Sequence, residues 1–136
     1  MTLRNRFSGM CLDVPGGSGD NKLQVQQYHC NGGANQKWEY LPGQYPGFGK
    51  FRNVASQKCL DVRDTSTSVG AIVQQYHCME VPNQQWTYPQ ADGFVMALHS
   101  GMCFGVYSNQ YKEKVYQAVC GGGNQFIFTQ WDASPF

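Results

Sequence analysis

Two carboxylates each precede a matching set of amide and aromatic residues. Asp13 is followed by the hexapeptide VQQYHC at residues 25–30, and Asp61 is followed by the same hexapeptide at 73–78. An ionised Asp accepts hydrogen bonds, a Gln amide both donates and accepts them, and a Tyr ring covers an apolar surface. A sugar offers the complementary groups, because it has a rim of hydroxyls and a face of C–H groups. The pattern therefore indicates recognition of a polyhydroxylated ligand.

The same residues do not form a catalytic set. Glycoside cleavage needs two carboxylates about 5–10 Å apart, and covalent catalysis needs a nucleophile beside a base. Each cluster contains one carboxylate, and the two clusters lie in different repeats, so we expect Asp13 and Asp61 to be too far apart. The sequence predicts a non-enzymatic protein without a cofactor.

The elements that position these residues belong to an internal repeat. Residues 3–40 align without a gap on residues 51–88, at an offset of 48, and both copies contain CLDV, VQQYHC and an Asn-Gln pair followed by Trp. A third copy begins near Val95 and keeps SGMC, Cys120 and an Asn-Gln pair at 124–125. We expect one domain over 1–136, with repeats at approximately 1–46, 47–92 and 93–136.

Each repeat alternates with the period of a β-strand. In KLQVQQYHC, Leu23 and Val25 alternate with Gln24, Gln26 and Tyr28. PGGSGDN and LPGQYPGFG are rich in turn residues, and no helical pattern continues for a dozen residues. Three repeats of about 45 residues are too few for a propeller. The sequence therefore predicts an all-β fold closed around a pseudo-threefold axis.

Composition excludes several partners. Charged residues make up 14% of the chain, the net charge is +1, and no block of like charge occurs. We therefore expect no nucleic-acid partner. The apolar runs are only a few residues long, so we expect no membrane insertion.

The cysteines predict a disulfide framework and an oxidising compartment, because an even number occurs in a small chain. We expect a secreted or extracellular protein, although the opening MTLRNRFSGM contains no signal peptide and cytosolic residence with free thiols stays open. His29 and His77 each precede a cysteine, but the spacing fits no common zinc site. The six cysteines are Cys11, Cys30, Cys59, Cys78, Cys103 and Cys120.

The run CLDV…VQQYHCNGGANQKW resembles the ricin B-type lectins, whose repeats carry C-x-D-V, Q-x-aromatic-x-C and N-Q-x-W. The resemblance implies a β-trefoil of three four-stranded lobes that binds galactose or N-acetylgalactosamine-type glycans of glycoproteins, glycolipids or polysaccharides. An attached toxin or hydrolase domain is a further implied partner. The implied binding residues are Asp13, Gln26, Tyr28, Asn35 and Gln36 in repeat one, and Asp61, Gln74, Tyr76, Asn83 and Gln84 in repeat two.

The expected geometry depends on one disulfide in each repeat. If Cys11 bonds Cys30 and the two residues face each other on antiparallel strands, Asp13 lies opposite Tyr28, and repeat two repeats this arrangement. A disulfide only requires its two cysteines to lie close together and does not determine the hydrogen-bond register of the strands, so the pairing can be less regular.

The third copy lacks the proposed binding groups. Aligned on its cysteines, it has Gly105 at the Asp position, Ala118 at the Tyr position, Tyr116 at the position of Gln26 and Ile127 at that of Trp38. We therefore expect repeat three to be silent.

Simpler structural roles are open for several of these residues. Trp38 and Trp86 are expected in the core and Trp131 as a C-terminal anchor. Gln36 and Gln84 satisfy backbone groups or support the Asp. The ring at the stacking position is Tyr, as in xylan-binding relatives, so a polysaccharide-binding module of a larger enzyme is one alternative. A protein-interaction trefoil that binds no sugar is the other.

Overall fold

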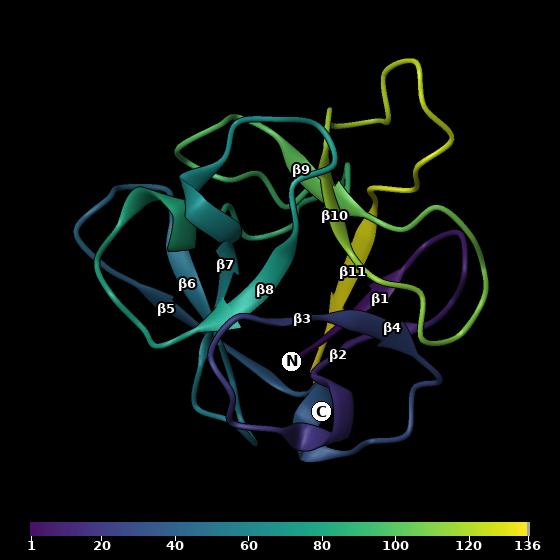
Figure 1. Ribbon diagram of the computed structural model, residues 1–136, viewed down its shortest axis with the longest axis horizontal. Coiled ribbons are helices and arrows are strands. Elements are labelled where there is room, and N and C mark those ends of the chain that lie inside the picture. The colour runs from purple at the N-terminus through teal and green to yellow at the C-terminus, as the bar shows by residue number, and fades with distance from the viewer. Residues whose placement is uncertain (136) are drawn as a thin grey trace.

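The computed structural model describes residues 1–135 and shows an all-β chain (Figure 1). That part contains no α-helix, and none of its helices is long and apolar enough to cross a membrane. Its strands are β1 (Thr2–Asn5), β2 (Cys11–Asp13), β3 (Leu23–Gln24), β4 (Gln26–Tyr28), β5 (Trp38–Pro42), β6 (Gly49–Asn53), β7 (Cys59–Val62), β8 (Val73–Tyr76), β9 (Cys103–Gly105), β10 (Tyr116–Ala118) and β11 (Trp131–Ser134). Its 3-10 helices are η1 (Pro15–Gly17), η2 (Ala34–Gln36), η3 (Arg63–Thr65) and η4 (Pro82–Gln84).

The strands form three groups around a common centre (Figure 1). The first strand, β1, pairs with both β2 and the last strand, β11, so the two ends of the chain meet in one sheet. In the five-stranded sheet, β3 and β5 of repeat one pair with β8 and β6 of repeat two. The repeats are therefore joined by strand pairing. The expected repeat limits at 46/47 and 92/93 fall in turns and stay predictions.

Three valines show how the fold closes on itself. Val25, Val73 and Val115, one from each repeat, are fully buried. The amide of Val25 donates to the carbonyl of Val73 (3.1 Å), that of Val73 to Val115 (3.3 Å), and that of Val115 to Val25 (3.1 Å). This ring of backbone hydrogen bonds confirms the predicted pseudo-threefold trefoil.

A buried glutamine in each repeat ties neighbouring lobes together. Its Oε1 accepts from a Ser hydroxyl of the same repeat, and its Nε2 donates to two carbonyls in the hairpin loop of the preceding repeat, at 2.7–3.0 Å. Because the trefoil is closed, repeat three takes the place of the preceding repeat for repeat one. The sets are Gln27 with Ser8, Ser108 and Gln110; Gln75 with Ser56, Ser18 and Asp20; and Gln117 with Ser100, Ser66 and Ser68. We call these residues the clamp glutamines. Repeat three keeps this glutamine as Gln117, although Gly105 and Ala118 stand at its Asp and Tyr positions, which indicates a scaffold role.

One disulfide closes a loop in each repeat, as predicted. The pairs are Cys11–Cys30, Cys59–Cys78 and Cys103–Cys120. Each contributes on the order of 3 kcal/mol by the loop-entropy estimate. No cysteine is free in the described residues, so none supplies a thiolate for a zinc site.

The third tryptophan occupies the place that the alignment gave to Ile127. The buried indoles of Trp38, Trp86 and Trp131 each donate from Nε1 to the carbonyl that follows the first cysteine of their repeat, at 3.0–3.1 Å. The alignment of Ile127 with Trp38 is therefore wrong. The loop after Cys120 is longer than in the other repeats, and this displaces the tryptophan along the chain.

This equivalence predicts similar losses from two substitutions. Trp131→Phe removes the Nε1 donor and leaves the buried carbonyl of Phe104 unpaired, which we expect to cost about 1–3 kcal/mol. Trp38→Phe does the same to Leu12. Urea unfolding should give similar free-energy losses for both variants, and a negligible loss for Trp131→Phe alone would contradict the assignment.

Candidate functional site

The strand register at each site differs by two residues from the predicted one. β2 and β4 pair Cys11 with Tyr28 and Asp13 with Gln26, and β7 and β8 have the same register. The prediction that Asp13 lies opposite Tyr28 is wrong, because Cys30 forms the disulfide from just beyond the end of β4. A shift of two residues leaves every side chain on its original face. Asp13, Gln26 and Tyr28 therefore still share one side of the ladder.

Three side-chain amides hold the Asp13 carboxylate. Oδ1 accepts from Gln26 Nε2 (3.0 Å), and Oδ2 accepts from Asn35 Nδ2 (3.1 Å) and Gln36 Nε2 (3.0 Å). A carboxylate offers about four acceptor positions. One acceptor position on Oδ1 therefore has no hydrogen-bond partner within residues 1–135.

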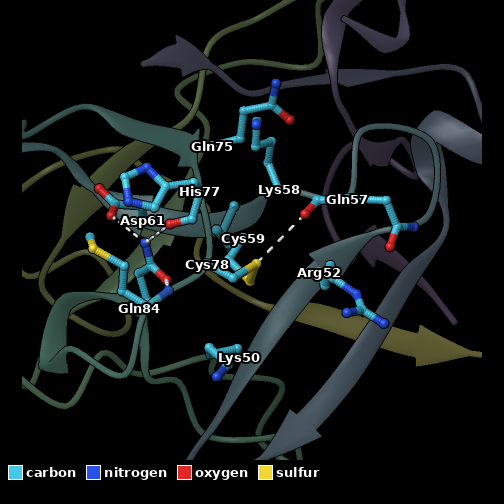
Figure 2. Close-up of a disulfide and its surroundings, with 12 residues drawn as sticks. Lys50, Arg52, Gln57, Lys58, Cys59, Asp61, Gln75, His77, Cys78 and Gln84 are labelled. Carbon is cyan, nitrogen blue, oxygen red and sulfur yellow. Dashed lines mark hydrogen bonds between the residues drawn. A yellow bond between two sulfur atoms is a disulfide. The ribbon is translucent and has the colours of Figure 1, made fainter. Parts of the chain in front are cut away.

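Asp61 has the same partners in repeat two. Its Oδ1 accepts from Gln74 Nε2 (3.0 Å), and its Oδ2 accepts from Asn83 Nδ2 (3.3 Å) and Gln84 Nε2 (3.0 Å). Figure 2 shows Asp61 beside Gln84 and His77, next to the disulfide of the repeat. The second network therefore reproduces the first one.

Gln36 and Gln84 lie behind the carboxylates. Both are fully buried. The Nε2 of each also donates to the carbonyl of His29 or His77 (2.8 and 2.9 Å), and the Oε1 accepts from the backbone amide two residues after that histidine. These contacts use both Nε2 hydrogens, so the two glutamines position the Asp and the adjacent loop.

Each carboxylate lines a surface hollow that is also lined by the Tyr of its repeat. Asp13 and Asp61 are only 2% and 3% exposed, whereas Tyr28 and Tyr76 are half-buried, so the acid lies deeper than the ring. The first hollow measures about 190 Å³ and is lined by Asp13, Gly16, Gln26, Tyr28, Asn31, Asn35 and Lys112. The second measures about 290 Å³ and is lined by Lys22, Asp61, Asp64, Thr65, Gln74, Tyr76, Met79, Val81 and Asn83. The structure thus brings together the predicted residues, with Gln36 and Gln84 behind them.

Three charged lining residues were missed at the sequence level. Lys112 comes from the hairpin loop of repeat three and Lys22 from that of repeat one, so packing between neighbouring lobes brings each lysine to its hollow. Asp64 gives the second hollow another carboxylate, so the expectation of a single carboxylate per cluster is wrong for repeat two. Its signal was in the sequence, because Asp64 follows Asp61 by only three residues. The exposed His29 and His77 do not line the hollows.

Repeat three fills the equivalent place with backbone. A Cβ on Gly105 would clash with the carbonyl oxygen of Phe128, so no side chain fits at the Asp position without a backbone shift. Thr129 replaces the buried glutamine, since its Oγ1 accepts from the amide of Gly121 (2.9 Å). The match of Asn124 and Gln125 to the first two repeats is therefore wrong.

Burial raises the pKa of both carboxyl groups. For Asp13 and Asp61, loss of hydration on burial is the largest effect on the pKa, and the amide hydrogen bonds lower it in part. The nearby Lys114 also lowers the pKa of Asp13, whereas Asp64 raises that of Asp61. Each site therefore gains a proton at a higher pH than an ordinary Asp does.

This shift predicts opposite effects of acid on ligand binding and on stability. Binding needs the ionised acceptor, so it should fall as the pH drops through the raised pKa. The folded protein binds more protons than the unfolded chain in the window between the raised pKa and the ordinary Asp value of 3.8, so the contribution of these groups to stability rises as the pH falls there.

Saccharide titrations and urea midpoints between neutral pH and pH 4 measure both effects, with Asp13→Asn plus Asp61→Asn as the reference for other groups. Relative to that variant, the wild-type midpoint should rise on acidification. A relative midpoint that falls would contradict the assignment.

Comparison with known proteins gives a consistent picture. The profile of the ricin-type beta-trefoil lectin domain matches residues 1–128. No curated protein sequence matches the chain. Among solved structures, the chain is similar to ThreeFoil, a designed 3-fold symmetric protein, with 35% identity, 97% coverage of each chain and a TM-score of 0.84.

Two longer natural proteins contain a similar region. One is 1,3Gal43A, an exo-beta-1,3-galactanase from Clostridium thermocellum, with 31% identity over 95% of this chain and a TM-score of 0.82. The other is the hemolytic lectin CEL-III, with 28% identity over 94% of this chain and a TM-score of 0.70. The chain spans only 29% of each of these two proteins. Because the family profile and the fold both extend along almost the whole chain, it belongs to the ricin-type β-trefoil lectin family of carbohydrate-binding domains.

Proposed function

We propose that the chain is a non-catalytic glycan-binding domain with two sites, one in repeat one and one in repeat two, and a silent third repeat. Galactose or N-acetylgalactosamine-type glycans are the proposed ligands. The observation that carries the proposal is the duplicated arrangement of a carboxylate held by three amides beside a half-buried Tyr ring in a surface hollow.

A sugar would bind with its C–H face on Tyr28 and a hydroxyl on the available position of Asp13 Oδ1. A hydrogen bond to an ionised group is stronger than a neutral one. Gln26 and Asn35 line the same hollow. Gln26 can offer its second Nε2 hydrogen and its Oε1 to neighbouring hydroxyls, whereas Asn35 can only accept through Oδ1, because its Nδ2 donates to Asp13 and to the carbonyl of Val14. Because their Nε2 and Nδ2 already donate to Asp13, these amides are ordered before the ligand arrives.

The geometry supports binding without cleavage. The acidic group common to both hollows is one buried Asp, and Gly16 stands in repeat one where repeat two has the additional Asp64. The two sites therefore do not share a pair of carboxylates. In repeat three, the carbonyl of Phe128 occupies the space that a side chain at Gly105 would need, which supports a silent lobe.

We also propose that this domain can form part of a larger protein. The similar region makes up 29% of the galactanase chain and of the CEL-III chain, so a catalytic or toxin domain is a proposed covalent partner. In that setting, the domain would hold its partner at a glycan or polysaccharide surface. The three disulfides favour a secreted or extracellular location.

A glycan array with the labelled chain tests the proposal. For each shallow site we expect a Kd of about 1 mM, near −4 kcal/mol. Two sites on one rigid body gain avidity on clustered glycans. We expect binding to clustered galactosides that free galactose competes away. Absence of all saccharide binding, together with a protein partner that galactose does not displace, would instead support the protein-interaction alternative.

A further inference from the structure

The two proposed sites differ at positions that surround their shared residues. At the repeat offset of 48, Gly16 corresponds to Asp64, and Asn31 corresponds to Met79, and all four residues line their hollow. Val81 lines only the second hollow. The second hollow is also larger, at about 290 Å³ against about 190 Å³. Repeat two therefore has room for a larger substituent and an apolar wall that repeat one lacks.

The first site is more positive than the second by one charge. The ionisable groups that line the hollows are Asp13 and Lys112 in the first, and Asp61, Asp64 and Lys22 in the second. Their formal charges cancel in the first site and leave one negative charge in the second. Lys114 acts on Asp13 near the first site, and Arg63 donates to Gln74 Oε1 (2.6 Å) near the second. His99 also acts on Asp61, but with histidine counted as neutral the difference of one charge remains.

The lysines occupy a backbone position that suits glycine. The amides of Lys22, Gly70 and Lys112 each donate to the carbonyl of a clamp glutamine, at 2.8–2.9 Å, so the three positions are equivalent. All have positive φ: 63° for Lys22, 68° for Lys112 and 90° for Gly70. A lysine there is strained. Lysine stands at this position beside both proposed sites, and glycine stands beside the silent repeat. The turn alone would favour glycine at all three positions, so a role of the lysine side chain in the site explains the two lysines better.

The loop of repeat three extends the rim of the first site. Tyr111 stacks on His29 (5.2 Å between ring centroids) and meets Tyr28 edge-on (5.7 Å). Lys112 Nζ lies 5.9 Å from the Tyr111 ring centroid. The ammonium group is therefore placed beside the aromatic residues that would cover the sugar.

We propose that the first site selects saccharides with an anionic substituent, which Lys112 binds, whereas the second site disfavours that charge through Asp64. The second site instead selects neutral sugars with an apolar substituent, such as an acetamido methyl group packed on Met79 and Val81. This inference rests on the proposed glycan sites and adds a difference in ligand class between them.

Single-site proteins test the inference. Asp61→Asn leaves the first site and Asp13→Asn leaves the second. Each is titrated with galactose, galactose 6-sulfate and galacturonic acid, with binding followed by NMR. In the first site we expect one or both anionic sugars to bind about fivefold more tightly than galactose, as one exposed ion pair allows. In the second site we expect both to bind more weakly than galactose.

Exchanges between equivalent positions provide matched controls. In the first-site protein, Lys112→Gly should remove the preference for the anionic sugar and Lys112→Arg should retain it. In the second-site protein, Asp64→Gly should raise the affinity for anionic sugars relative to galactose. Both glycine variants place a residue that the chain itself uses at that turn, so the fold should persist, as circular dichroism can verify.

The outcomes separate this inference from the proposed function. Galactose binding at both sites with equal ratios of anionic to neutral affinity would overturn the charge selection alone. A ratio that Lys112→Gly leaves unchanged would also overturn it. Failure of all three sugars to bind either protein would overturn the proposed function and the inference together. A preference for the sulfate but not the uronate, or the reverse, identifies the anion and supports the inference.

Discussion

Gln27→Ala is expected to destabilise the protein far more than Gln26→Ala, although the two residues are adjacent and chemically identical. Gln27 is fully buried and forms three hydrogen bonds, two of which join repeat one to the loop of repeat three. Truncation leaves two carbonyls and a hydroxyl without their partner and opens a cavity. We estimate a loss of about 2–4 kcal/mol in the free energy of unfolding, against a total of roughly 5–15 kcal/mol for a domain.

The neighbouring glutamine has a different role. Gln26 donates one hydrogen bond, to Asp13 Oδ1, and that carboxylate keeps two other amide donors. We therefore expect Gln26→Ala to cost about 1 kcal/mol of stability and to weaken saccharide binding. Urea unfolding of both variants measures the difference.

Repeat three provides the control for the clamp. Gln117→Ala should cost as much as Gln27→Ala, because it breaks the equivalent three hydrogen bonds in a lobe that has Gly105 at the position of Asp13. A small loss for Gln117→Ala beside a large one for Gln27→Ala would contradict a threefold scaffold role.

The double variant Asp13→Asn plus Asp61→Asn should lose saccharide binding and keep its fold. Each substitution removes a charged acceptor, and a hydrogen bond to a charged group contributes about 1.5–3 kcal/mol. Starting from about −4 kcal/mol, that loss moves the Kd beyond about 10 mM. Surface plasmon resonance on a clustered galactoside, with circular dichroism of the same sample, measures both properties.

The single variants should differ in stability. After Asp13→Asn, the amide of Gln26 can rotate to present its Oε1, which takes part in no hydrogen bond in residues 1–135. After Asp61→Asn, the same rotation would break the hydrogen bond from Arg63 to Gln74 Oε1. We therefore expect Asp61→Asn to be the less stable of the two. Undiminished binding by the double variant would remove the carboxylates from the proposed sites.

Periodicity and repeated motifs predicted the fold class and the features that lie within one repeat. The closed all-β fold and the buried Trp38 and Trp86 follow from period-2 alternation and from the duplication at an offset of 48. The pairing of cysteines inside each repeat is confirmed. The juxtaposition of Asp13 with Gln26 and Tyr28 was also expected, because side-chain alternation puts them on one face whatever the register.

Two kinds of feature were not predicted: those that depend on loop length, and the contacts between residues of different lobes. The register was wrong by two residues, because a disulfide constrains proximity and not the ladder. The longer loop after Cys120 hid the equivalence of Trp131 with Trp38. Lys112 reaches the hollow of repeat one only because the last repeat packs beside the first. No spacing within the sequence encodes such a contact between lobes.

The most direct test is a titration of the ¹⁵N-labelled chain with galactose, read from the NH₂ signals of asparagine and glutamine side chains. Signals of Gln26 and Asn35 in repeat one, and of Gln74 and Asn83 in repeat two, should shift as the sugar saturates, while that of the clamp residue Gln117 stays in place. Shifts confined to repeat three, or saturable binding that leaves all four site amides unmoved, would contradict the two-site account.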